Sequence, residues 1–130
     1  MKIIVGYDGS DAAKEAVRVA QKHAQAFDGK IYLVTSLAGG TAENEKELEK
    51  AKNELGMASK FLENRRIACE EHLLVRGMEP GEDIVRFAED HQADEIIIGV
   101  HKKSRVQKFL LGSNAQHVIL NAPCLVSVVK

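Results

Sequence analysis

Short runs of β-branched and other apolar residues alternate along the chain with longer segments whose apolar positions follow helical spacing. The short runs predict five strands, at 2–7, 31–37, 70–76, 96–98 and 124–129. The longer segments predict four helices, at 12–27, 43–66, 82–91 and 113–120. Most of these segments are separated by Gly, Pro, Asn or Asp, which are typical of turns and helix ends.

This alternation of strands and helices predicts an α/β fold of the Rossmann type, in which helices cover both faces of an open parallel sheet. We expect five strands in the order 3-2-1-4-5, connected by four helices. Ligands bind such sheets beyond the carboxyl ends of the strands, where the chain changes direction. For this order that place lies between the first and fourth strands, so Asp8 and Gly99 are expected to lie close together.

Composition narrows the function classes. With 130 residues the chain is expected to form a single domain, 1–130, and its net charge of −1 gives no overall attraction to nucleic acid. Aromatic residues make up only 5%, which leaves no stacking platform for single strands. No apolar window reaches membrane-spanning length, so we expect a cytoplasmic protein. Cys69 and Cys124 are predicted to be buried free thiols.

Candidate chemistry gathers after the fourth predicted strand. Gly99 follows that strand, and Gly112-Ser113 opens the last helix, so free backbone N–H groups could gather there and hold an anion. Between them lie four cationic residues that are candidate phosphate contacts: Lys102, Lys103, Arg105 and Lys108. The alternative is a solvated loop whose charges have no ligand.

Two segments give the chain a resemblance to a known family. Residues 3–10 read IIVGYDGS, and the closing part contains LLGS at 110–113 and APCLV at 122–126. In these segments, and in its order of elements from end to end, the chain resembles the universal stress proteins. The resemblance implies an adenine nucleotide alpha hydrolase-like fold, a role in the stress response, and binding of ATP or AMP at the corner between strands one and four.

Members of the family that bind ATP carry the pattern Gly-x2-Gly-x9-Gly-Ser. Here Gly99 and Gly112-Ser113 keep the spacing, and Lys102 replaces the second glycine. The resemblance implies that the nucleotide contacts are Gly6, Tyr7, Asp8, Ser36, Gly99, Val100, His101, Lys102, Gly112, Ser113, Asn114 and Ala115. Ser36, which ends the second predicted strand, is more polar than the apolar residue usual in the family.

Lys102 leaves two outcomes open. In a left-handed conformation a lysine costs on the order of 1 kcal/mol, which a folded domain can absorb. Its side chain either occupies the space of a phosphate or contributes charge-assisted hydrogen bonds worth roughly 1.5–3 kcal/mol each. Any Mg²⁺ would arrive with the nucleotide, held mainly by phosphate oxygens, and the spacing of the histidines predicts no metal site in the protein itself.

The sequence contains neither a Walker motif nor a GxSxG motif, so we expect a binding protein rather than an enzyme, with weak ATP hydrolysis left open. The alternative function is a dimeric interaction or regulatory module that binds no nucleotide. The apolar strand Cys124–Val129 is predicted to form a sheet edge that can pair with another strand. The resemblance implies a homodimer through this strand, and a further stress-response partner is unknown.

Overall fold

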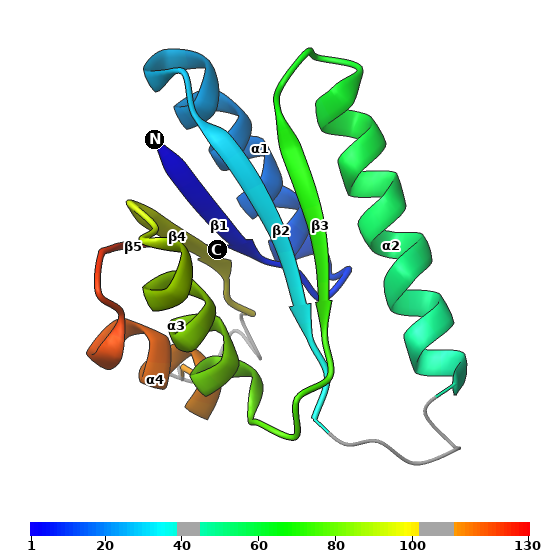
Figure 1. The fold of residues 1–130 in the computed structure, drawn as a ribbon, viewed down its shortest axis with the longest axis vertical. Coiled ribbons are helices and arrows are strands. Elements are labelled where there is room, and N and C mark those ends of the chain that lie inside the picture. The colour runs from blue at the N-terminus through cyan, green and yellow to red at the C-terminus, as the bar shows by residue number, and fades with distance from the viewer. Residues whose placement is uncertain (39–44, 102–110) are drawn as a thin grey trace, which may run out of the picture.

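The computed structural model describes residues 1–38, 45–101 and 111–130, which form one α/β unit (Figure 1). Its five strands pair in parallel in the order β3-β2-β1-β4-β5. The expected fold class and strand order are therefore confirmed. The elements are β1 (Lys2–Gly6), α1 (Asp11–Phe27), β2 (Lys30–Ser36), α2 (Glu45–Glu63), β3 (Cys69–Leu74), α3 (Pro80–His91), β4 (Glu95–Gly99), α4 (Ser113–Asn121) and β5 (Leu125–Val129).

Two apolar layers hold the sheet between pairs of helices. Alternate residues of the central strand β1 face opposite sides, with Ile3 and Val5 in the layer under α1 and α2, and Ile4 in the layer under α3 and α4. All three side chains are fully buried, and each such burial stabilises the fold by about 1.5–3 kcal/mol. Figure 1 shows α1 and α2 on one face of the sheet and α3 and α4 on the other. None of the helices in the described ranges is long and apolar enough to cross a membrane.

The end of α1 differs from the sequence-based expectation. The left-handed cap is Asp28, with φ 51° and ψ 53°, and not Gly29, although the pair does end the helix as expected. Asp tolerates this conformation better than most residues with a side chain. Phe27, the last residue of α1, is 65% exposed although it is a large apolar residue.

Two other elements end earlier than expected. Strand β3 stops at Leu74, so Val75 and Arg76 belong to the loop that leads to α3. Helix α2 ends at Glu63 but runs without interruption through Gly56. Both cysteines are free, as expected, but they are half-buried rather than fully buried.

A buried carboxylate ties three elements together at the amino end of β4. Glu95 is fully buried, and its Oε1 lies 2.7 Å from Nδ1 of His23 on α1. Its Oε2 accepts a hydrogen bond of 2.5 Å from the hydroxyl of Ser127 on β5. Both oxygens of this charged group therefore have partners, as a buried carboxylate requires.

Candidate functional site

A cavity of about 490 Å³ lies at the carboxyl edge of the sheet, where the strand order reverses. The carboxyl ends of β1, β2 and β4 form its floor, and α2, α3 and α4 contribute its walls. Its volume falls within the range of sites for small ligands and cofactors. The residues of the sequence-predicted site that line it are Gly6, Tyr7, Asp8, Ser36, Gly99, Asn114 and Ala115.

The other predicted site residues lie elsewhere. Val100 is buried, and its N–H donates to the carbonyl of Val129, so it supports the sheet rather than lining the cavity. His101 is exposed, with Nε2 3.8 Å from Oδ2 of Asp8 at the cavity's edge. Gly112 and Ser113 open α4 but are not part of the cavity lining. The predictions for Lys102, Lys103, Arg105 and Lys108 fall outside the described residues.

The turn after β1 fixes Asp8 beside the cavity. Oδ1 of Asp8 accepts a hydrogen bond of 3.0 Å from the N–H of Ser10, and the Ser10 hydroxyl in turn caps α1 by accepting from Ala13 N at 3.1 Å. Gly9 between them has φ 79°, and a Cβ added there would lie only 1.7 Å from Oε2 of Glu54. The positive φ of this turn therefore favours glycine, and the Asp8 side chain remains 66% exposed, with Oδ2 beside the exposed His101.

The two glycines of the motif serve different purposes. A Cβ on Gly99 would lie 2.4 Å from the carbonyl carbon of Ala12, so glycine is needed for the close approach of β4 to α1. A Cβ on Gly112 would meet nothing within 4 Å among the described atoms, and its φ of −64° suits any residue. The fold of the described residues thus explains Gly99 without a ligand and leaves Gly112 unexplained. In addition, α4 begins with Gly112 as its N-cap and Ser113 as its first residue, so Ser113 is not the residue that caps the helix.

Helices α3 and α4 contact each other at the cavity wall through Gly81 and Asn114. The N–H of Gly81 donates to Oδ1 of Asn114 at 2.9 Å. A Cβ on Gly81 would lie 2.8 Å from the backbone oxygen of Asn114, so glycine permits this contact. Asn114 is therefore oriented by α3 before any ligand arrives.

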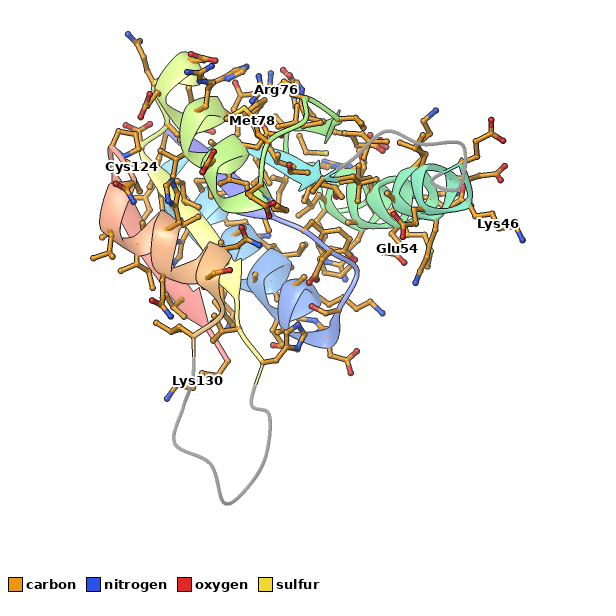
Figure 2. All side chains as sticks on the ribbon, turned by 90° about the horizontal axis from the view of Figure 1, so that it is seen from below. Lys46, Glu54, Arg76, Met78, Cys124 and Lys130 are labelled. Carbon is orange, nitrogen blue, oxygen red and sulfur yellow. The ribbon has the colours of Figure 1, made fainter. Side chains whose placement is uncertain are left out.

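Ser36 is held by a buried carboxylate behind the cavity wall, and this carboxylate also pairs with the exposed Arg76. Its hydroxyl donates to Oδ2 of Asp83 at 2.7 Å, and Nε of Arg76 donates to Oδ1 of the same carboxylate at 2.7 Å. Nη2 of Arg76 contacts this Oδ1 as well. Asp83 is fully buried in the first turn of α3, where the helix dipole also favours a negative charge. Figure 2 labels Arg76 in the loop that leads to α3.

Tyr7, one of the residues that line the cavity, keeps a protonated phenol. Burial raises the pKa of Tyr7, and the nearby carboxylates of Glu54 and Asp8 raise it further. The backbone at Tyr7 is fixed on both sides, because its N–H donates to the carbonyl of Val34 at 2.8 Å and its carbonyl accepts from the hydroxyl of Thr35 at 2.6 Å. The phenol therefore remains a hydrogen-bond donor throughout the physiological pH range.

Sequence reasoning missed the wall that α2 contributes. The Glu and Lys pattern of this helix is typical of a solvated face, yet Glu47, Lys50 and Glu54 line the cavity together with Ala51. Figure 2 labels Glu54 on this helix. Their spacing places them on one side of the helix, and this signal could have suggested a shared surface. Other lining residues that were not predicted are Val34, Thr35, Leu37, Pro80, Gly81, Ile84, Ile98 and Val118.

The charges of the described lining are mainly negative. Three carboxylates, those of Asp8, Glu47 and Glu54, face one ammonium group, that of Lys50. Such a surface suits the hydroxyl and amino groups of a ligand better than its anionic groups. Among the residues described by the structure, no group of three or more His, Cys, Asp or Glu side chains could hold a metal ion.

Comparison with known proteins places the chain in one family. The sequence model of the Universal stress protein family matches residues 1–130. Universal stress protein MJ0531 of Methanocaldococcus jannaschii is 36% identical over 140 aligned positions, which cover 99% of this chain and 81% of that protein.

Solved structures of the family share this fold. A universal stress protein from Archaeoglobus fulgidus is 39% identical, with a TM-score of 0.91 over 100% of this chain and 98% of that one. A structure of the universal stress protein from Archaeoglobus fulgidus in complex with dAMP is 37% identical, with a TM-score of 0.84 and the same coverage.

Proposed function

The chain belongs to the universal stress protein family, and we propose that it binds an adenine nucleotide, ATP or AMP, as a cytoplasmic stress-response protein. The observation that carries this proposal is the cavity at the carboxyl edge, which joins Asp8, Gly99 and Asn114 at the corner expected from the strand order. Support also comes from the similar structure from Archaeoglobus fulgidus, which is described as a complex with dAMP.

In this proposal the base and ribose occupy the cavity and the phosphates lie outside it. The acidic lining suits the ribose, because Oδ2 of Asp8 can accept a hydrogen bond from a ribose hydroxyl. The phosphates reach the start of α4, where the N-cap Gly112 makes no side-chain cap hydrogen bond in the described part of the chain and backbone N–H groups can bind an anion. Positive charge comes from Lys102, Lys103, Arg105 and Lys108, and Mg²⁺ accompanies ATP when it binds.

Isothermal titration with ATP and AMP at low salt tests the proposal. We expect heat of binding with the wild type and none with Gly112→Val, because the valine side chain occupies the space of the phosphates. The variant should fold normally, since a Cβ at this position meets no atom within 4 Å in the described structure. The matched control is Gly99→Val, which should unfold because its Cβ would lie 2.4 Å from the Ala12 carbonyl carbon. A folded wild type that gives no heat with either nucleotide contradicts the proposal.

The proposed role is binding, with no catalytic residue assigned. Asp8 is oriented by Ser10 and faces the cavity, and hydrogen bonding to ribose accounts for that position. We expect phosphate release from ATP at the background rate, measured with a coupled assay. Release well above background that Asp8→Asn abolishes would instead indicate a hydrolase.

A second candidate function rests on the exposed edge of the sheet. Leu125 and Val128 of β5 are 63% and 38% exposed, and Leu120 of α4 is 79% exposed. An apolar edge strand of this kind is a surface for strand pairing. We propose that Cys124–Val129 pairs with the same strand of a second copy, and that this dimer binds an unknown partner of the stress response if the cavity binds no nucleotide. Light scattering at micromolar concentration should show a dimer, and Leu125→Lys should show a monomer; a monomeric wild type contradicts this proposal.

A further inference from the structure

The two hydroxyl groups that β2 contributes to the cavity wall donate their protons to acceptors inside the protein. A serine hydroxyl has one proton to donate and two lone pairs that accept. The proton of Ser36 goes to Oδ2 of Asp83 at 2.7 Å, and that of Thr35 goes to the carbonyl of Tyr7 at 2.6 Å. Ser36 lines the cavity, so its side chain offers a ligand only lone pairs.

Asp83 determines the direction in which the Ser36 hydroxyl donates its proton. It is fully buried, and Arg76 occupies its other oxygen through Nε at 2.7 Å. Because an ionised carboxylate has no proton to give, Ser36 must act as the donor in their hydrogen bond. Asp83 does not line the cavity, so any influence it has on a ligand passes through Ser36.

We propose that Ser36 distinguishes bases by the substituent on the purine ring, accepting a hydrogen bond from an exocyclic amino group and disfavouring an oxo group, with Asp83 as the positioning residue. This inference rests on the proposed nucleotide site. Adenine carries an amino donor at the position where hypoxanthine and guanine carry an oxygen acceptor. Two acceptors that face each other away from water leave both without a partner, which a polar site rejects strongly.

The ion pair dictates what Asp83→Asn would do. Both nitrogens of Arg76 that contact Oδ1 are donors, so the amide oxygen of Asn must take this place. The NH₂ group then faces Ser36 and donates to its hydroxyl oxygen. The hydroxyl proton of Ser36 is released toward the cavity, and the wall changes from an acceptor into a donor that suits an oxo group.

The experiment compares the affinities of AMP and IMP, which differ in the exocyclic group at this position of the purine and in the proton that IMP carries on the neighbouring N1. Wild-type protein should prefer AMP by about tenfold or more. Ser36→Ala removes the lone pairs while leaving Asp83 and Arg76 paired, so the preference should fall to about twofold or less. Asp83→Asn should likewise remove the preference or reverse it toward IMP.

Ser127→Ala is the matched control. Ser127 donates to the buried carboxylate of Glu95 at the opposite end of the sheet, so its loss removes the same kind of hydrogen bond far from the cavity. The Ser127→Ala variant should prefer AMP over IMP to the same extent as the wild type. Circular dichroism confirms that each variant is folded, and Ser36→Ala decides the question if Asp83→Asn does not fold.

The possible outcomes distinguish a failure of the Ser36 inference from a failure of the proposed nucleotide site. A folded wild type that binds neither AMP nor IMP overturns the proposed nucleotide site and the inference with it. Equal affinity for AMP and IMP, or a preference that survives in Ser36→Ala, overturns the inference alone. A preference that is lost in both Ser36→Ala and Ser127→Ala also overturns it, because the effect would then be a general loss of stability.

Discussion

Two buried carboxylates, one at each end of the sheet, are held by similar sets of partners. At the carboxyl end, Asp83 accepts from the hydroxyl of Ser36 and from the guanidinium of Arg76. At the amino end, Glu95 accepts from the hydroxyl of Ser127 and pairs with the imidazole of His23. Both carboxylates are fully buried.

Their surroundings differ, and so do their consequences. Asp83 lies in the first turn of α3 directly behind a cavity residue, and the helix dipole adds to its stabilisation. Glu95 lies on the strand β4, where it depends on its side-chain partners and joins α1 and β5 to the sheet. The same local chemistry therefore supports a ligand wall at one end and connects structural elements at the other.

The largest effect is expected from His23→Ala. This change removes the imidazole beside the buried carboxylate of Glu95, which keeps its hydrogen bond from Ser127, and losing one member of such a pair costs about 3 kcal/mol. Urea unfolding should show this loss, while the affinity for AMP in the folded state stays unchanged. His117→Ala is the control, because the hydrogen bonds of the His117 side chain and carbonyl in the described part of the chain are with Asn121 on the same helix. This variant should change the free energy of unfolding by less than about 0.5 kcal/mol. Similar losses for the two histidine variants would contradict the role given to Glu95.

A smaller loss of stability, now joined to a loss of binding, is expected from Arg76→Ala. Asp83 keeps its bond from Ser36 and the favourable helix dipole, so the free energy of unfolding should fall by about 2 kcal/mol. The affinity for AMP should fall several-fold, because the group that orients Ser36 is no longer fixed.

The control for this variant is Arg65→Ala. Arg65 donates to the carbonyl of Phe61 and lies 3.6 Å from the centre of its ring, at the end of α2 and away from the cavity lining. Titration with AMP should therefore give wild-type affinity. If Arg65→Ala weakens AMP binding as much as Arg76→Ala, the loss in Arg76→Ala does not come from the contact of Arg76 with Asp83 beside the cavity.

The smallest effect is expected at Cys124, because its pKa depends in part on the charge of Glu95 at the amino end of the sheet. Burial raises the pKa of Cys124, and the negative charges of Asp94 and Glu95 raise it further. Glu95→Gln should lower this pKa and speed alkylation by iodoacetamide at pH 8 by roughly twofold, because more thiolate is present.

Cys69 provides the internal control for that measurement. Its pKa is raised by burial and by Glu63 and Glu71, and Glu95 is not among the causes. Mass spectrometry of the modified peptides should show an unchanged rate at Cys69 in Glu95→Gln. Equal acceleration at both cysteines would indicate that the variant opens the fold and would contradict the electrostatic explanation.

The general architecture could be predicted from the sequence because it follows from local periodicity. Apolar runs and helical stripes gave the order of the elements, and the rules for parallel sheets placed Asp8 near Gly99. Boundaries were less accurate where a side chain or a cap decided them, as at Asp28, where Gly29 had been expected.

The finer organisation of the site could not be predicted because it depends on contacts between distant segments. Glu54 has the pattern of a solvated helix residue, and only the packing of α2 beside the β1 turn brings it to the cavity. The sequence marks Asp83 only as an acid near the start of a predicted helix, and His23 only as a polar residue within one. Their partners Ser36 and Glu95 lie 47 and 72 positions away in the chain, beyond the reach of any local pattern.

The different constraints on the glycines make this domain a practical scaffold for engineering. Gly81 and Gly99 must remain because a Cβ there would collide with backbone atoms of a neighbouring helix, and Gly9 must remain because its φ is 79°. A Cβ on Gly112 would meet no described atom within 4 Å, whereas Ser36 must keep its hydroxyl because this group donates to the buried Asp83. A library that varies Gly112 alone would therefore sample new ligand preferences while each member keeps the contacts of the described fold.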